Sequence, residues 1–245
     1  MKYKFKNNKS KLVRNIKNNF IITRLHGLYT DIIFHKKNNN HRETFSHIFQ
    51  TNQWKDSESL SGPGSNSIAA KNLTTKLPAL LNKYNIKKLL DTPCGDFNWM
   101  SKIDFSNVQY IGGDIVPELI DYNQTKFGKE NISFIVIDIC NDPLPETDII
   151  LVRDCLVHMK HELVMRFFKN LCKSNIKYLL VTSFPLTSYN HDIKTGNWWP
   201  MNIEKPPFNL PKPIDILIED GDEFNGQFPD KSLLLYKIAD LKNYD

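Results

Sequence analysis

The sequence predicts an α/β fold: a doubly wound, mostly parallel sheet of seven strands with an antiparallel hairpin at one edge. Short apolar runs alternate with stretches of helical periodicity, and the runs are apolar at successive positions. Strands that are apolar on both faces and alternate with helices are typical of a parallel sheet covered on both sides. Five such runs predict the parallel strands, at residues 88–92, 110–115, 134–139, 149–153 and 178–184.

The edge hairpin is expected near the end of the chain. Residues 214–218 and 232–238 are strand-like, and the segment between them contains the turn residues Gly221, Gly226 and Pro229. We expect these two strands to form an antiparallel pair that closes one edge of the sheet.

Helices are expected before and between the strands. Ser65 can cap a helix that runs to about residue 85. Further helical segments are clearest at residues 118–127 and 162–172. The apolar face of the first helix would comprise Ile68, Leu73, Leu77, Leu80 and Leu81.

Length and composition indicate a globular protein. A chain of 245 residues with 40% hydrophobic residues can bury a real core, which excludes a disordered or fibrous protein. Its apolar runs fall far short of the roughly 20 residues of a membrane-spanning helix, and no secretory signal is visible, so we expect a cytoplasmic protein. The four cysteines are scattered, which predicts neither a zinc site nor a disulfide framework.

Residues 1–49 are predicted to be a basic leader, partly helical or disordered, ahead of a domain at residues 50–245. Residues 1–42 contain eleven Lys or Arg and one acid, whereas the remaining chain has 21 basic and 26 acidic residues. Such a leader can contact an anionic membrane surface or an acidic partner protein, and a solvated tail is the structural alternative. Because the body is acidic, we expect no nucleic-acid partner.

Residues 186–213 form an unusual connection with five prolines and no periodicity. Connections of this length without regular structure are usually lids or binding loops. We expect Trp198 and Trp199 to offer a platform for a flat or ring-shaped ligand. A decorative insertion is the alternative.

An acidic residue ends or closely follows each of four consecutive predicted strands. They are Asp91, Asp114, Asp138 and Asp154. Ligands of open parallel sheets bind at the carboxyl ends of the strands, so these side chains are expected around one site. The first turn lacks G-x-G-x-x-G and the chain lacks G-x-x-x-x-G-K-[ST], which disfavours a nicotinamide dehydrogenase and a P-loop kinase. Carboxylates suit a ligand with hydroxyls and amines, and Asp114 is placed to accept both ribose hydroxyls.

The motifs at the strand ends resemble, in their order, the class I S-adenosylmethionine-dependent methyltransferases with a Rossmann-like fold. They read LLDTPCGDFNWM, YIGGDIVPELI, FIVIDICNDPLP, DIILVRDCLVHM and YLLVTSFP. The D-x-P-C-G-D-F-N-W-M motif is similar to a subgroup often encoded among glycan-biosynthesis genes, and the similarity covers roughly residues 50–240. The generic loop D/E-x-G-x-G-x-G is poorly kept, with Gly95 present but Pro93 and Phe97 at the other two glycine positions.

The resemblance implies S-adenosylmethionine as cofactor and a role for each matching position. For the methionine part of the cofactor it implies Asp91, Cys94, Gly95, Asp96 and Asn98. For the ribose, the adenine and further cofactor contacts it implies Asp114, Ile115, Asp138, Ile139 and Arg153. The structural alternatives are that Asp91 or Asp96 caps a helix and that Asp138 begins a turn.

Asp154 and His158 lie four residues apart after the fourth strand, where members of the family place residues that face the acceptor. A sugar hydroxyl must lose its proton during methyl transfer, and we expect His158 to be the general base, with Asp154 orienting it. Alternatively, His158 caps the next helix and Asp154 pairs with Arg153 or a lysine. No metal signature is present. Substrate contacts are expected from Ser61, His191, Asp192, Trp198, Trp199 and Asp230.

The resemblance leads to three hypotheses of function. The first is O-methylation of a sugar hydroxyl in a glycan or nucleotide-sugar precursor, with glycan-assembly enzymes docked on the leader. The second is N-methylation of an amino sugar, a small metabolite or a protein. The third is a non-catalytic, cofactor-binding partner of a glycosyltransferase.

Overall fold

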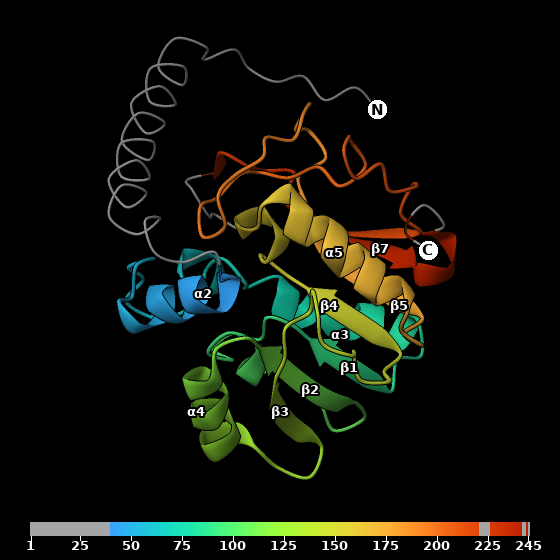
Figure 1. Ribbon diagram of the computed structural model, residues 1–245. Coiled ribbons are helices and arrows are strands. Elements are labelled where there is room, and N and C mark those ends of the chain that lie inside the picture. Colours follow the sequence, from blue (N-terminus) through green and yellow to red (C-terminus); the bar gives the residue numbers. More distant parts are fainter. Residues whose placement is uncertain (1–39, 221–225, 242–243, 245) are drawn as a thin grey trace. The chain divides into compact units, whose positions relative to one another are not determined.

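The computed structural model describes residues 40–220, 226–241 and 244, which form a compact unit from His41 onward. At its centre lies a seven-stranded sheet with the order β3–β2–β1–β4–β5–β7–β6 (Figure 1). The strands are β1 (Lys88–Asp91), β2 (Gln109–Asp114), β3 (Ile132–Val136), β4 (Ile149–Val152), β5 (Tyr178–Ser183), β6 (Asp215–Ile218) and β7 (Ser232–Lys237). The α-helices are α2 (His41–Gln50), α3 (Leu73–Lys83), α4 (Pro117–Phe127) and α5 (His161–Cys172).

The pairing of the strands confirms the predicted α/β class and the antiparallel edge. Strands β1 to β5 pair only in parallel among themselves, while β7 is antiparallel to both β5 and β6. The strand order reverses at β1, whose last residue, Asp91, is in register with Gly112 of β2 and Leu151 of β4. This switch point is where open α/β sheets bind their ligands.

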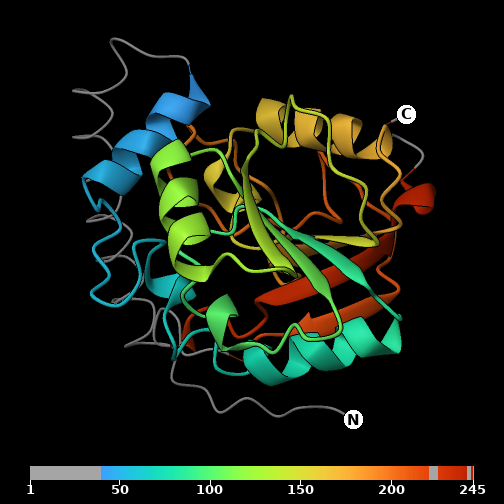
Figure 2. The same ribbon diagram turned by 90° about the horizontal axis from the view of Figure 1, so that it is seen from below.

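Helices α3 and α5 cover opposite faces of the sheet. Figure 2 shows α5, in gold, on one side and α3, in teal, on the other. Along α5 the residues Leu163, Phe167 and Leu171 are buried at helical spacing, and α3 buries Leu73 and Leu77 in the same way. Each such side chain contributes about 1.5–3 kcal/mol to stability through burial. Because an apolar helix surface covers each face of the sheet, the parallel strands are apolar on both faces.

The helix expected from Ser65 begins later, at Leu73. Asn66 Oδ1 instead accepts two backbone N–H groups of the following residues, at 2.9 and 3.1 Å. Such a side-chain bond competes with helix formation, and turns occupy residues 66–72. Ile68, expected on the apolar face, is therefore 69% exposed.

Residues 186–213 contain no helix or strand. They are held by two asparagine side chains: the buried Asn202 donates to the carbonyls of Pro185 and Thr187, both at 3.0 Å, and Asn190 donates to the carbonyl of Asn202 at 2.8 Å. Ile203 is buried as well. The segment thus packs onto the domain at several points along its length.

The predicted leader falls largely on residues 1–39, which lie outside the described residues. Its last part, residues 41–49, forms helix α2 and belongs to the compact unit. Within the described ranges, no helix has the length and hydropathy that crossing a bilayer requires.

Candidate functional site

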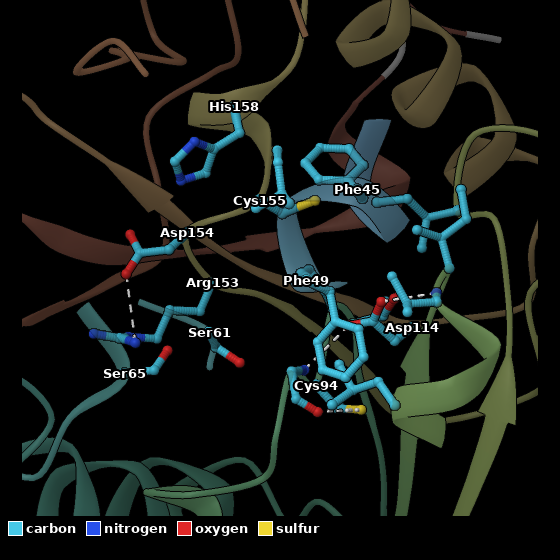
Figure 3. Close-up of a pocket in the computed structure, with 18 of the residues that line it drawn as sticks. Phe45, Phe49, Ser61, Ser65, Cys94, Asp114, Arg153, Asp154, Cys155 and His158 are labelled. Atoms are coloured by element: carbon cyan, nitrogen blue, oxygen red, sulfur yellow. Dashed lines mark hydrogen bonds and ion pairs between the residues drawn. The ribbon is translucent and has the colours of Figure 1, made fainter. Parts of the chain in front are cut away.

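A cavity opens at the carboxyl edge of the sheet, next to the switch point between β1 and β4. The space inside it and at its mouth, open solvent included, measures about 1010 Å³. Figure 3 shows Cys94 and Asp114 in one part of it and Asp154 and His158 in another. The sequence-predicted site residues that line it are Ser61, Asp91, Cys94, Gly95, Asp114, Ile115, Asp138, Ile139, Arg153, Asp154 and His158.

Asp91 is the last residue of β1 and is 3% exposed. Its carboxyl group accepts a hydrogen bond from the Tyr110 hydroxyl at 2.6 Å. Burial raises the pKa of Asp91 to about 7, although Tyr110 and the nearby Arg153 oppose the rise. The group is therefore divided between its neutral and ionised forms near neutral pH.

Asp114 is the last residue of β2 and lines the same cavity. Its carboxylate oxygens accept the backbone N–H groups of Gly95 at 3.2 Å and Val116 at 3.1 Å. Burial raises the pKa of Asp114 to about 6, while these two backbone donors act against the rise. Two carboxyl groups with raised pKa values thus stand at the ends of adjacent strands.

The turn after β1 needs glycine at position 95. Gly95 has a φ of +54°, and a Cβ there would lie 2.1 Å from Ser61 Oγ. Its carbonyl accepts a hydrogen bond from Asn123 Nδ2 at 2.7 Å. The turn is therefore packed tightly between α4 and the 58–65 loop, with its N–H aimed at Asp114.

Asp138 follows β3 and meets the first residue of α2. His41 Nε2 lies 2.8 Å from Asp138 Oδ2, and the backbone N–H of Cys140 and the side chain of Asn141 also donate to this carboxylate, at 2.9 and 2.8 Å. Burial works in the opposite direction, but these donors prevail and lower the pKa of Asp138 to about 2. Asp138 thus begins a turn, the structural alternative, and also lines the cavity as a carboxylate.

His41, Asp138 and Cys140 bring three potential metal-ligand atoms within 4.8 Å of one another. The Cys140 thiol, however, donates to the carbonyl of Leu163 at 3.4 Å, and burial raises its pKa to about 12. Since thiolate is the ligand form of cysteine, this arrangement does not favour a metal ion.

A buried network of ion pairs joins β4, β6 and β7 beside the cavity. Arg153 donates to both carboxylate oxygens of Glu219, from Nη2 at 2.7 Å and from Nε at 3.2 Å. Lys231 Nζ lies 2.6 Å from Asp154 Oδ2, which is also 3.4 Å from Arg153 Nη1. Burial by itself would raise the pKa of Asp154, but Lys231 and Arg153 outweigh it and hold that pKa below its ordinary value. Asp154 is therefore paired with cations, as in its structural alternative.

His158 ends a short 3-10 turn, η3 (Leu156–His158), and has a defined tautomer. Its Nδ1 lies 3.0 Å from the carbonyl oxygen of Asn197, and because a carbonyl only accepts, Nδ1 carries a proton. In the neutral imidazole Nε2 is then an acceptor. Burial lowers the pKa of His158 from 6.5, against the opposing effects of Asn197 and Asp154, so the neutral form prevails at pH 7.

His158 does not cap the next helix, which was its structural alternative; another residue does. The N-terminus of α5 has no side-chain cap from its N-cap residue, Lys160. The carboxylate of Asp192 accepts the backbone N–H of His161 at 2.7 Å instead. His158 is thus left to the cavity, whereas Asp192, predicted to contact substrate, lies at the start of α5 outside the cavity lining.

Asp96 and Asn98 do not line the cavity. Asp96 accepts the backbone N–H of Leu60 at 2.8 Å, and Asn98 donates to Glu58 at 2.9 Å and to the carbonyl of Ser65 at 3.2 Å. Both residues tie the 58–65 loop to the turn after β1. They therefore support a wall of the cavity in this arrangement rather than face into it.

The predicted aromatic platform also lies outside the lining of the described cavity. Trp198 packs edge-on against Phe184 and Phe228, with ring centroids 5.9 and 5.1 Å apart. Trp199 contacts His191, with ring centroids 5.2 Å apart and the ring planes inclined by 55°. Asp230 accepts the backbone N–H of Leu186 at 2.7 Å. These residues of the 186–213 segment and the last turn pack among themselves and onto the domain.

Helix α2 and the loop after it supply aromatic side chains to the cavity, whereas the sequence predicts an aromatic platform from residues 186–213. Phe45, Phe49 and Trp54 line the cavity together with His41. No pattern in the sequence identifies them: His41, Phe45 and Phe49 lie in the predicted leader, next to a highly charged stretch, and Trp54 follows it as an isolated aromatic residue. The sequence analysis also did not single out Glu219, which pairs with Arg153. Glu219 is an acidic residue directly after β6, and the same pattern predicted Asp91.

No family model and no curated protein matches the chain. Solved structures do. The N-methyltransferase NodS from Bradyrhizobium japonicum WM9 is 15% identical over 71% of this chain and 98% of that chain, with a TM-score of 0.52. This likeness shows the fold alone: a mostly parallel seven-stranded α/β sheet with an antiparallel edge pair, shared with a methyltransferase.

Two further solved structures match this chain with lower TM-scores. Human N-acetylserotonin methyltransferase, solved with S-adenosylmethionine, is 15% identical over 66% of this chain, with a TM-score of 0.49, and the match spans half (50%) of the human chain. The methyltransferase domain of bacterial CtHen1 is 19% identical over 46% of this chain, with a TM-score of 0.41, and 65% of that domain is covered.

Proposed function

We propose that the protein is an S-adenosylmethionine-dependent methyltransferase that transfers a methyl group to a sugar hydroxyl. One observation carries the proposal: Asp91, Asp114 and Asp138, from three neighbouring strands, line the same cavity as a neutral, tautomer-fixed His158. The carboxylates match the hydroxyls and amines of the donor, and the histidine matches a protonated acceptor oxygen.

The donor set of the cavity fits S-adenosylmethionine. Asp114 keeps acceptor capacity for hydroxyl groups beside its two backbone donors, and Asp91 adds negative charge close to it. Ile115, Leu119 and Ile139 give the cavity an apolar surface for a flat base. When bound, the cofactor supplies an electrophilic methyl group on a sulfonium, a cation that suits an acidic cavity.

His158 is the general base of this proposal. Its Nδ1 proton is held by the carbonyl of Asn197, so Nε2 is free to take a proton from an acceptor hydroxyl. The apolar wall of Phe45, Phe49 and Trp54 excludes water from the place where acceptor and methyl donor must align.

A hydroxyl acceptor is favoured over an ammonium-bearing one by the state of Asp154. This carboxylate is neutralised by Lys231 at 2.6 Å and by Arg153 at 3.4 Å. It is therefore not an open anionic site for an ammonium group beside His158. N-methylation of an amino sugar or another small metabolite is the second candidate, and product analysis decides between them.

The test is transfer of a labelled methyl group from S-adenosylmethionine to a panel of neutral sugars, nucleotide sugars and glycan fractions. We expect an O-methyl product, and His158→Ala should lower kcat by about 10²- to 10⁴-fold while S-adenosylhomocysteine still binds in calorimetry. His47→Ala serves as the matched histidine control, because His47 does not line the cavity. A methylated nitrogen as product, or full activity of His158→Ala, would contradict the proposal.

Two accompanying proposals concern the leader and the location. Residues 1–42, with eleven basic residues, suit docking to glycan-assembly enzymes or to an anionic membrane surface, and the four free cysteines suit the reducing cytoplasm. The test compares the whole chain of 245 residues with a chain that lacks residues 1–39. We expect only the whole chain to co-purify with partner enzymes or with acidic vesicles.

A further inference from the structure

Trp54 lines the cavity directly beside His158. The centroids of the indole and the imidazole are 4.9 Å apart, and the two ring planes are inclined by 34°. Trp54 belongs to the loop between α2 and the 3-10 turn η1 (Pro63–Ser65), so it reaches the histidine from a different part of the chain. The two rings are close enough for the indole to limit the orientations of the imidazole.

The position of Trp54 is itself fixed by Gly62. Gly62 has a φ of +88°, and a Cβ at this position would lie 3.1 Å from Trp54 Cβ and 3.4 Å from its Cε3. The tryptophan therefore packs on bare backbone, with no side chain between them that could give way. Any larger residue at position 62 would be strained and would push the indole from its place.

His158 is restrained at a second point by Asn197. The hydrogen bond from Nδ1 to the Asn197 carbonyl, at 3.0 Å, fixes one edge of the imidazole but does not by itself stop the ring from tilting about that edge. In Figure 3 the labelled His158 has one ring nitrogen toward Asp154 and the pocket and the other away from them. The indole contact supplies the missing restraint on the ring plane.

We propose that Trp54 is a positioning residue for His158: its indole holds the imidazole so that Nε2 stays directed into the cavity, and its π face stabilises the imidazolium. The second effect arises because an aromatic face attracts a cation within about 6 Å of its centroid. When His158 takes the acceptor's proton, the new N–H bond forms at Nε2 and the positive charge appears beside the indole. Catalytic contact with the acceptor remains with His158.

The inference rests on the proposed function for the identity of the base, but it depends on no contact between Trp54 and cofactor. The charged groups that face His158 are Asp154 and Lys231. Both stay unchanged in the variants below, so differences among these variants report on position 54.

The experiment compares Trp54→Phe, which keeps an aromatic face, with Trp54→Leu, which keeps apolar bulk alone. We expect Trp54→Leu to lower kcat about tenfold to one hundredfold and Trp54→Phe to lower it less than about threefold, with the acceptor KM little changed in both. Tyr122→Leu is the matched control, since Tyr122 is 48% exposed on α4. Calorimetry should give an unchanged dissociation constant for S-adenosylhomocysteine; a weaker one in Trp54→Leu would place Trp54 in cofactor binding and overturn the inference.

A second readout needs no activity. The ring chemical shifts of His158, followed through a pH titration of the ligand-free protein, report the pKa of its imidazole, and we expect a lower pKa in Trp54→Leu than in the wild type and Trp54→Phe, because leucine has no π face to stabilise the imidazolium. An unchanged pKa of His158 or an unchanged kcat in Trp54→Leu overturns the inference. Trp54→Met replaces Trp54→Leu if circular dichroism shows the latter unfolded. If the wild type methylates no acceptor, the proposed function fails, whereas the comparison of the His158 pKa values still decides the role of Trp54.

Discussion

At the scale of single residues, Asp91 and Asp114 share an unusual state. Burial raises the pKa of Asp91 to about 7 and that of Asp114 to about 6, from an ordinary 3.8. A ligand that donates hydrogen bonds to a carboxylate favours its ionised form. Binding of a nucleoside hydroxyl to Asp114 should therefore release a proton at pH values below about 6.

Replacement of Asp114 by Asn tests this assignment. Asp114→Asn removes a charged acceptor, so we expect the affinity for S-adenosylhomocysteine to fall about tenfold to one hundredfold. In the wild type the affinity should rise from about pH 5 to about pH 7, as ionisation of the raised carboxyl ceases to cost free energy, and this rise should be smaller in the variant. Calorimetry across this range measures both quantities.

The control is Asp121→Asn, an equivalent change at an exposed position on α4. It should leave affinity and pH dependence as they are. Equal affinity of Asp114→Asn and the wild type would remove Asp114 from the proposed ribose site.

The strand-end acids could be predicted from the sequence because the end of an apolar run fixes where a side chain lies along the sheet. Asp91 and Asp114 are the last residues of their strands, and both line the cavity. The surroundings of Asp96 and Trp198 could not be predicted in this way. Their neighbours, Leu60 and Phe228, are far away in the chain, and a long-range contact of this kind has no local signal.

At the scale of elements, β6 is tied to the domain by an ion pair at each end. Asp215, its first residue, pairs with the exposed Lys83 of α3 at 2.7 Å, and Glu219, just after its last residue, pairs with the buried Arg153. A surface pair contributes about 0–1 kcal/mol, whereas removal of one partner from a buried pair costs about 3–5 kcal/mol. The two ends of one short strand therefore differ greatly in sensitivity.

Glu219→Gln and Asp215→Asn form a matched pair of variants. Glu219→Gln should lower the free energy of unfolding by about 3–5 kcal/mol, because it leaves the Arg153 guanidinium buried without that carboxylate. Asp215→Asn should lower it by no more than about 1 kcal/mol. Urea unfolding measures both, and equal effects would show that burial does not decide the strength of these pairs.

Element types were predictable where periodicity was strong, and boundaries were not. Strands β1 to β7 and helices α4 and α5 follow the predicted runs within three residues at each end, whereas α3 starts later than Ser65. There the side chain of Asn66 binds the backbone and stops helix formation, and this competition is invisible to a count of apolar positions. Helix α2 was not predicted as part of the domain, because only Ile48 of its residues is buried.

At the scale of the whole molecule, the ligand-free protein should be most stable in mildly acidic solution. Folded Asp91 and Asp114 bind protons more tightly than unfolded carboxyls, so between about pH 4 and pH 7 the folded state carries more protons and its stability falls as the pH rises. Asp138 acts on the acid side: its pKa of about 2 gives stability that is present above pH 3.8 and lost as the pH falls toward 2.

Urea unfolding of the ligand-free protein at a series of pH values checks this expectation. The free energy of unfolding should decline from about pH 5 to about pH 8, and Asp91→Asn should remove a part of the decline on the order of 3 kcal/mol. Asp121→Asn should show the same decline as the wild type. A flat profile for the wild type would mean that the two carboxyls titrate normally.

Helix α2 also decides at which residue a shortened chain should start. A shortened chain starting at residue 50 would keep all seven strands and both covering helices, and by circular dichroism it would pass for the intact domain. It would nevertheless lack His41, Phe45 and Phe49, and with them one side of the cavity. Boundaries drawn around the sheet alone would thus yield a folded chain with an incomplete cavity, and screens for ligands should use chains that start ahead of His41.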